Sequence, residues 1–227
     1  MSNLDRNATI AQIVTEHAFA ARVFQKHGLD YCCHGDVRLP EACRPKGLDP
    51  EAVFAEVEAA LADGPGTPEP DARALTTAGL VARIVDRHHG YLRRALPAIA
   101  PIAEKVARVH GPHDPRLREV HAVFGALSDA LLPHLDEEEE VLFPALMSRR
   151  PDPALLSREL DKMLTEHLAV GDMLARLRKL TDDFTLPEWG CNTYRVLLTE
   201  LDSLEADILE HVHLENHVLV PRFAPAN

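Results

Sequence analysis

Two segments of this sequence interrupt their own apolar helix face with the same pair of polar residues. His134 and Glu138 break the apolar seam of one predicted helix, and His211 and Glu215 break the seam of another. A histidine and a glutamate four residues apart project side by side from one face of a helix. Burying an unpaired imidazole or carboxylate is costly, so a core that contains two such pairs has to supply partners for them.

The two segments also form an internal repeat. The chain reads HLDEEEEVLFP from His134 and HVHLENHVLVP from His211, with identical residues at offsets 0, 4, 7, 8 and 10. Two helices that each carry one half-site predict a pseudo-two-fold bundle with two equivalent metal ions.

Two further helices are expected to complete the ligand set. The third has a seam with alternating spacings of four and three residues, and His167 lies in the middle of it. On the first helix both His88 and His89 fit the apolar spacing, so periodicity leaves two candidates. Glu137, Glu139 and Glu140 are interpreted as a solvated helix face. Imidazole and carboxylate ligands together suit iron, manganese or zinc better than calcium or copper(I).

The spacing of apolar residues and prolines predicts an all-α protein. Four long amphipathic helices are expected at residues 76–96 (with an extension over 99–109), 116–147, 153–180 and 188–220. Short connections between long helices favour an antiparallel four-helix bundle. We expect a small helical N-terminal domain with a DYCCHG loop over residues 1–62, a linker rich in proline and glycine over 63–72, and the bundle over 73–227.

Composition excludes several classes of partner. Lys+Arg 24 against Asp+Glu 36 gives a net charge of −12, which disfavours binding to nucleic acid or to an anionic membrane. No run approaches the roughly 18 apolar residues that a membrane span requires. The first residues lack the basic start and apolar run of a signal peptide, and four cysteines are too few for a disulfide framework in a chain of this size. We therefore expect a cytoplasmic protein.

Cys32 and Cys33 are the second chemical feature of the sequence. Adjacent cysteines cannot form an unstrained disulfide with each other, so a structural bridge between them is not expected. One interpretation is a redox pair, an electron relay or a transient contact to a metal or cluster. The alternative is a pair of thiols packed beneath a loop.

These blocks resemble a known family. HxxxE followed by VLFP, HxxxEN followed by VLVPR, the lone EH of the third helix and RHHGYLRRALP on the first are similar to hemerythrin-like domains. The run TIAQIVTEHAFAARVFQKHGLDYCCHG resembles the short cysteine-bearing domain that precedes such a bundle in iron–sulfur cluster repair proteins, the RIC group of YtfE/ScdA type. The chain departs from this pattern at His88, where the family often has tyrosine, and at His34, where glycine is common.

The resemblance implies a fold, a ligand set and a function. In this family the first-helix ligand stands eight residues before the proline of the Leu-Pro pair, which selects His89 over His88. The implied fold is a hemerythrin-like four-helix bundle, and the implied cofactor is two non-haem iron ions, oxo- or hydroxo-bridged when oxidised. The ligands carried over from the family pattern are His89, His134, Glu138, His167, His211 and Glu215.

The implied role is repair of iron–sulfur clusters damaged by oxidative or nitrosative stress. Iron donation and reduction of NO to nitrous oxide are both expected chemistries, so the chain is a candidate NO-reducing oxidoreductase with Cys32 and Cys33 as its redox pair. Expected partners are damaged iron–sulfur proteins, NO, O₂ and an electron donor, with no nucleic acid and no membrane; the protein is expected to be a monomer or a homodimer. The alternatives are an O₂- or NO-binding or sensing protein without turnover, and a structural zinc bundle.

Overall fold

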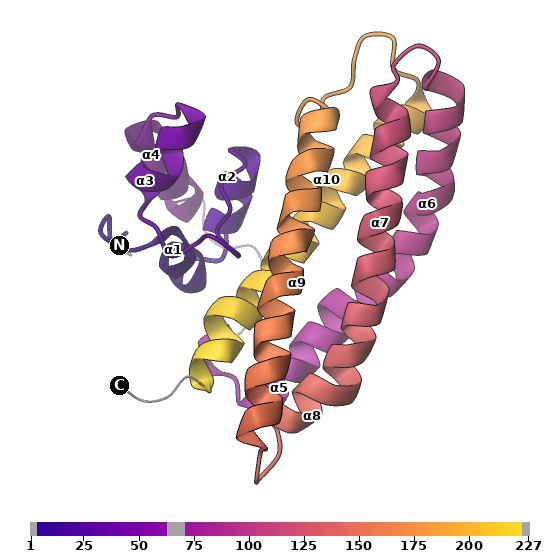
Figure 1. Ribbon diagram of the computed structural model, residues 1–227. Helices are drawn as coiled ribbons and strands as arrows, with labels where there is room; N and C mark the ends of the chain where they lie inside the picture. Colours follow the sequence, from indigo (N-terminus) through magenta and orange to yellow (C-terminus); the bar gives the residue numbers. More distant parts are fainter. Residues whose placement is uncertain (1–3, 63–70, 224–227) are drawn as a thin grey trace. The chain divides into compact units, whose positions relative to one another are not determined.

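The computed structural model describes residues 4–62 and 71–223. Within these residues the fold is all-α, and the extended pairing is limited to an isolated bridge between Thr9 and Arg38 (Figure 1). The chain divides into two compact units. Residues 81–208 form the bundle unit, and residues 1–80 with 209–227 form the N-terminal unit. The expected linker, 63–72, lies outside the described residues except for its last two positions, and the expected domain boundaries stay a prediction.

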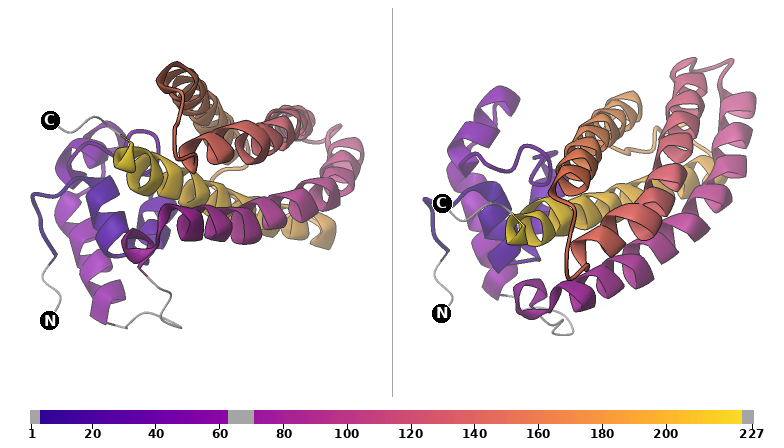
Figure 2. Two further views of the ribbon diagram at one scale, coloured as in Figure 1. Left: turned by 90° about the horizontal axis from the view of Figure 1, so that it is seen from below. Right: turned by 60° about the horizontal axis from the view of Figure 1, so that its bottom comes forward.

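The bundle unit is built from long helices that pack side by side. α6 contacts α7 and α7 contacts α9, as the views in Figures 1 and 2 also show. These helices and the neighbouring segments are α6 (Gly90–His110), α7 (Arg116–Glu137), α8 (Phe143–Leu146), α9 (Pro153–Leu180) and α10 (Asn192–His213), of which α10 crosses the boundary between the two units. Leucine, valine and phenylalanine fill the interior because the apolar stripe of each helix faces its neighbours.

Two helices differ in extent from those expected from the sequence. α6 runs without a break from Gly90 to His110 and contains Pro97 and Pro101, whereas the sequence predicted one helix over 76–96 with an extension over 99–109. The fourth helix begins at Asn192 and not near residue 188, because the Gly190 N–H donates to the Pro187 carbonyl at 2.8 Å and closes a turn there. A proline inside a helix removes one backbone hydrogen bond, and burial of the apolar face of α6 outweighs this loss.

Residues 71–223 contain three short π-helical segments within their long helices. They are η3 (Ile84–His89) and η4 (Glu138–Leu142) in the bundle unit and η5 (Leu214–Leu219) in the N-terminal unit. A π segment widens one turn of a helix and shifts the faces of the residues that follow it, and such segments are common at functional sites. Each of the three contains one residue of the candidate ligand set: His89, Glu138 or Glu215.

The N-terminal unit combines short helices with the end of the chain. Its elements are α1 (Ile10–Glu16), α2 (Ala20–Lys26), α3 (Leu39–Cys43), η1 (Arg44–Lys46), α4 (Pro50–Ala62), η2 (Ala72–Ala74), the start of α5 (Thr77–Arg83), η5 and η6 (Val220–Arg222). Thr9 caps α1 through a capping box with Gln12. Gly28, at a φ of 61°, ends the α2 region. Within this unit, α1 packs against η5. Helix α3 was not predicted from the sequence.

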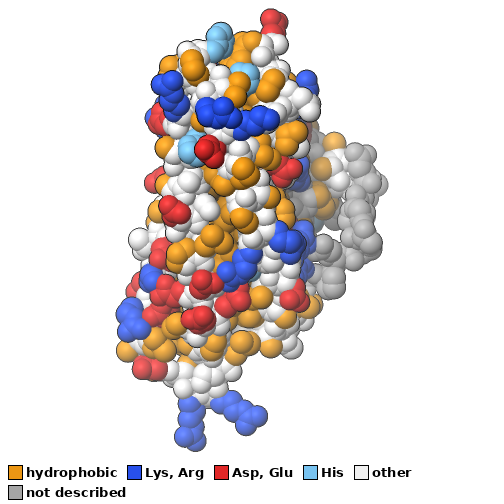
Figure 3. Space-filling model, turned by 90° about the vertical axis from the view of Figure 1, so that its right-hand side faces the viewer, with side chains coloured by type: hydrophobic (Ala, Val, Ile, Leu, Met, Phe, Trp, Pro, Cys, Tyr) orange, Lys and Arg blue, Asp and Glu red, His pale blue; other side chains and the backbone are white. Residues whose placement is uncertain are grey.

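The bundle surface carries both signs of charge. Figure 3 shows Lys and Arg interspersed with Asp and Glu, and acidic side chains gather in the lower part of the face that it presents. Across the described residues, none of the helices combines the length and the apolar character needed to traverse a lipid bilayer.

Candidate metal centre

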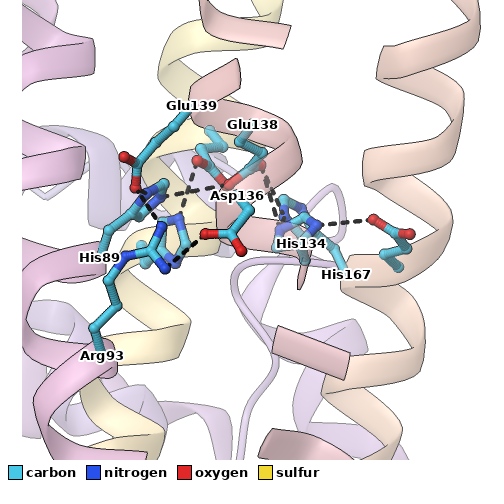
Figure 4. Close-up of polar contacts among 10 residues, drawn as sticks. His89, Arg93, His134, Asp136, Glu138, Glu139 and His167 are labelled. Atoms are coloured by element: carbon cyan, nitrogen blue, oxygen red, sulfur yellow. Dashed lines mark hydrogen bonds and ion pairs between the residues drawn. The ribbon is translucent and has the colours of Figure 1, made fainter. Parts of the chain in front are cut away.

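Glu138 lies between three histidines. His134 precedes it by one helical turn, and His89 and His167 come from two other helical segments. The Oε1 atom of Glu138 is 3.3 Å from Nε2 of His134 and 4.0 Å from Nε2 of His167, whereas Oε2 is 3.4 Å from Nε2 of His89. Figure 4 shows this carboxylate with His89 on one side and the other two histidines on the opposite side. The two oxygens of one buried carboxylate therefore face two separate groups of imidazole nitrogens, which is the arrangement of a bridging ligand.

His134 and His167 approach each other directly. Their Nε2 atoms are 3.2 Å apart, and both side chains are almost fully buried. Nitrogens this close cannot both carry protons, so at least one presents a lone pair. α7 and α9 bring the rings together because their apolar seams pack against each other.

The outer nitrogens of two of these rings contact carboxylates. Nδ1 of His134 lies 2.8 Å from Oε2 of Glu166, and Nδ1 of His89 lies 2.8 Å from Oε1 of Glu139. A ring that donates its Nδ1 proton to a carboxylate directs an unprotonated Nε2 toward the opposite side, where a metal ion accepts its lone pair. The outer contacts thus orient both rings for metal binding.

Arg93 extends this outer layer around His89. It donates to Oε1 of Glu139 at 2.9 Å and pairs with Asp136 at 2.7 Å (Figure 4). Partial burial opposes ionisation of Glu139, but the hydrogen bonds from His89 and Arg93 outweigh it and hold the pKa of that carboxyl below its usual value. Glu139 is partly exposed, as a solvated helix face requires, but it also contacts His89, which the sequence did not predict.

The remaining predicted pair lies in the N-terminal unit. Nε2 of His211 is 3.0 Å from Oε1 of Glu215, and both side chains are fully buried. The two residues are one helical turn apart across the junction of α10 and η5, so they project from the same face. This pair repeats the relationship between His134 and Glu138, as the sequence repeat predicted.

His88, the alternative to His89, contacts a different group. Its Nδ1 atom lies 3.0 Å from Oδ1 of Asp207 on α10, and its side chain is fully buried. His89 is the member of the pair whose ring approaches Glu138. Both histidines are buried because they belong to the π segment η3, which presents adjacent residues to the interior.

The donor set of the bundle unit fits a transition-metal ion. Three imidazoles converge on one carboxylate that is about as buried as they are, and mixed nitrogen and oxygen ligands suit iron, manganese or zinc. Ligand atoms of His134, Glu138 and His167 all lie within 4.8 Å of one another. A buried carboxylate surrounded by imidazoles is energetically unfavourable without a cation, so the composition of this cluster supports metal binding.

The cysteine loop is organised around Asp30. Oδ1 of this residue accepts hydrogen bonds from the backbone N–H groups of Cys32 and Cys33 at 3.1 and 2.8 Å, and Oδ2 contacts Nδ1 of His34 at 2.7 Å. The two sulfurs are 3.5 Å apart as free thiols. The Cys32 carbonyl accepts hydrogen bonds from Asn216 and His217 of η5 at 3.0 and 2.9 Å.

The two thiols differ in environment. The hydrogen bond with Cys33, burial and the charge of Asp30 raise the pKa of the Cys32 thiol well above its usual value. Cys32 therefore stays protonated at neutral pH, whereas Cys33 is only half-buried. Cys33 is the member of the pair that a reagent or partner reaches.

Comparison with known proteins agrees with this arrangement. Residues 80–223 match the family described as the hemerythrin HHE cation binding domain, and residues 6–61 match the ScdA N-terminal domain family, described as a domain of unknown function. A Staphylococcus haemolyticus protein named iron–sulfur cluster repair protein ScdA is 32% identical over 223 residues, which cover 97% of this chain and 100% of the relative.

Two Yersinia relatives have a similar length. Proteins of Yersinia pseudotuberculosis and Yersinia pestis, each named iron–sulfur cluster repair protein YtfE, are 35% identical over 217 residues, with 96% of each chain covered. This chain belongs to the ScdA/YtfE family. The hemerythrin-like part of this ScdA/YtfE protein contains all six residues of the candidate ligand set.

Proposed function

We propose that this protein binds two iron ions through His89, His134, Glu138, His167, His211 and Glu215 and restores damaged iron–sulfur clusters. The observation that carries the proposal is the position of Glu138, whose two oxygens face separate groups of histidines. The sequence repeat supports His211 and Glu215 as the second half-site, and the names of the ScdA and YtfE relatives support the role in cluster repair.

At such a centre, different residues of the protein would bind the ions, orient the ligands and exclude water. Glu138 would hold both ions, and the histidines would supply neutral nitrogen ligands. Glu139 and Glu166 would fix the orientation of two histidine rings, and burial would exclude bulk water from the ligands. Bound iron would supply one-electron chemistry and a position for a diatomic molecule such as NO or O₂.

We further propose that Cys32 and Cys33 form the redox pair of this chemistry. Their sulfurs are 3.5 Å apart, so an electron donor or acceptor that reaches Cys33, the accessible thiol, also comes close to Cys32. Damaged iron–sulfur proteins would be the clients, and iron donation and reduction of NO to nitrous oxide are the two candidate reactions. Both reactions require iron that leaves or changes oxidation state, which a structural zinc site does not provide.

The first test is a metal count on protein purified from iron-replete cells, combined with an absorption spectrum. The proposal expects about two irons per chain, as two equivalent half-sites require, and the absorption of an oxo-bridged diferric centre. Stoichiometric zinc in place of iron would contradict it.

The second test separates repair chemistry from simple ligand binding. The reduced protein is mixed anaerobically with NO in a single turnover, and the gas phase is analysed for nitrous oxide. In parallel, the iron-loaded protein is incubated with an enzyme whose [4Fe–4S] cluster has been damaged by NO, and the activity of that enzyme is followed. A protein that binds NO reversibly, releases no nitrous oxide and restores no cluster would be a carrier or sensor.

A further inference from the structure

A second chemically notable pair lies at the end of the bundle where the α6–α7 and α9–α10 connections meet (Figure 1). Nε2 of His110, the last residue of α6, lies 3.1 Å from Sγ of Cys191, which immediately precedes α10. The two residues are 81 positions apart in the sequence, and Cys191 is exposed. Histidine side chains are visible at the surface near this end of the bundle (Figure 3).

The start of α10 adds to the polar environment of this sulfur. Backbone N–H groups of Thr193 and Tyr194 also form hydrogen bonds with Cys191. The first N–H groups of a helix have no partner within the helix and stabilise negative charge in front of them. The hydrogen bond with His110, followed by these backbone contacts, lowers the pKa of the Cys191 thiol to about 7.

Aromatic residues hold the imidazole in place. The ring of His110 lies 5.7 Å from the ring of Trp189 and 6.2 Å from that of Tyr194, measured between centroids. The nearby charged side chains pair with one another, because Arg116 contacts Asp114 at 2.8 Å and Asp182 at 3.0 Å, and this group as a whole carries one negative charge. His110 is therefore the titratable side chain that acts on the sulfur.

We propose that Cys191 is a modification site that undergoes thiol–disulfide exchange with small disulfides, with His110 as its proton partner. The Cys191 thiolate attacks one sulfur of the disulfide RSSR and forms a new S–S bond, while the original S–S bond breaks. RS⁻ leaves with the electron pair and takes up a proton from the His110 imidazolium or from water. Cys191 is oxidised to a mixed disulfide, and one half of the small disulfide is reduced to a thiol.

The other cysteines do not share this combination of features. Cys43 is fully buried, and burial raises the pKa of its thiol. Cys32 is buried with a strongly raised pKa. Cys33 is half-buried beside Cys32. Within the described part of the chain, Cys191 combines exposure, an imidazole at hydrogen-bond distance and a helix N-terminus.

The test uses iron-loaded, full-length protein and a limiting amount of 4,4′-dithiodipyridine, with the modified cysteine mapped by mass spectrometry. At pH 7 a thiol with a pKa of about 7 has about fifty times more thiolate than an ordinary thiol, but each thiolate is about tenfold less nucleophilic, so Cys191 should react about fivefold faster than an ordinary exposed thiol. Cys33 should be modified after Cys191 because its side chain is half-buried. Trp189 is the single tryptophan of the chain and lies two residues away, so its fluorescence reports the same reaction.

Two substitutions sharpen the result. His110→Gln should slow the reaction of Cys191 at pH 7 by up to about fivefold and move its pH midpoint upward, because the hydrogen bond that lowers the thiol pKa most is lost. Above pH about 9, where both thiols are ionised, the variant should react faster than the native protein, because the thiolate of higher pKa is the better nucleophile. The control is His113→Gln, since His113 contacts the Trp189 ring at 4.6 Å without a contact to the sulfur; it should leave the rate unchanged.

The pH dependence of the native protein provides a measurement that needs no variant. A midpoint near pH 7 for modification of Cys191 supports the proposal, and a midpoint near that of an ordinary thiol overturns it. Preferential modification of Cys33, or an unaltered rate in a folded His110→Gln protein, would also overturn it.

Discussion

The Nε2 atoms of His134 and His167 face each other at 3.2 Å in the interior of the bundle unit. Glu166 contacts Nδ1 of His134 on the opposite side of that ring, and Glu138 lies beside both rings. Two imidazoles and a carboxylate without a cation would lower the stability of this core, whereas a shared cation makes the same contacts favourable.

Glu138→Gln should remove most of the bound iron. The amide keeps the size of the side chain, but it lacks the negative charge and the second strong oxygen donor that a bridging ligand needs. We expect iron content to fall from about two to below one per chain, together with a lower melting temperature of the iron-loaded protein, because metal binding contributes folding free energy.

The matched control is Glu140→Gln, two residues further along the same π segment and exposed to solvent. Both variants lose one negative charge, so a general electrostatic effect would appear equally in each. Equal iron content and equal melting temperature in the two variants would argue against Glu138 as a ligand.

Glu139→Gln should weaken iron binding without abolishing it. The neutral amide is a weaker acceptor for His89 Nδ1, and it no longer balances Arg93. Loss of such an outer contact costs about 10- to 100-fold in metal affinity. Competition with a chelator of known affinity measures this change, and the absorption spectrum of the residual centre should keep its form. An affinity equal to that of Glu140→Gln would show that the Glu139 contact does not support the ligand.

Cys33 should be alkylated before Cys32 at neutral pH. Burial and hydrogen bonding raise the pKa of Cys32, so its thiolate forms only well above neutral pH, and its sulfur is also shielded from reagents. Limited treatment with iodoacetamide followed by peptide mapping gives the order of reaction. A faster reaction at Cys32 than at Cys33 would contradict this prediction and would mean that the loop opens readily in solution.

Asn216→Ala should increase the exposure of Cys32. The Asn216 side chain donates to the Cys32 carbonyl, and a hydrogen bond of this kind contributes about 1 kcal/mol, or roughly fivefold in the population of an opened loop. Alkylation of Cys32 should accelerate by a similar factor. Asn7→Ala is the control, because that exposed asparagine lies in the same unit and its backbone N–H donates to Asp5. Identical alkylation rates in the two variants would contradict the anchoring role.

Gly35→Ala should destabilise the N-terminal unit. A Cβ atom at this position would lie 2.3 Å from the Tyr31 carbonyl oxygen and 2.6 Å from the Cβ atom of Ala11, so the backbone has to move. Overpacking of this kind costs about 1–3 kcal/mol in free energy of unfolding.

Gly125→Ala is the matched comparison for this substitution. Apart from the neighbouring residues and backbone of α7 itself, none of the described residues comes within 4 Å of the added Cβ, and alanine has a helix propensity about 1 kcal/mol better than glycine. Chemical denaturation followed by circular dichroism should therefore show opposite shifts for the two variants. Stabilisation by Gly35→Ala would contradict the close packing of the cysteine loop.

The sequence by itself predicted the helical class and the family. It also predicted the buried pairs His134/Glu138 and His211/Glu215, because a spacing of four residues fixes a shared helix face wherever the helix packs. His167 followed from the same periodicity. These features are local, so the order of residues along one helix is sufficient to recognise them.

Only the tertiary structure placed His89 beside Glu138 and His88 beside Asp207, because the extra residue of a π segment shifts the helix face and defeats a 3.6-residue period. The contacts of Glu139 with His89 and of Glu166 with His134, and the pairing of His110 with Cys191, likewise depend on how separate helices pack. The relative rotation and register of packed helices arise from side-chain interlocking along their whole length, which no single segment of sequence encodes.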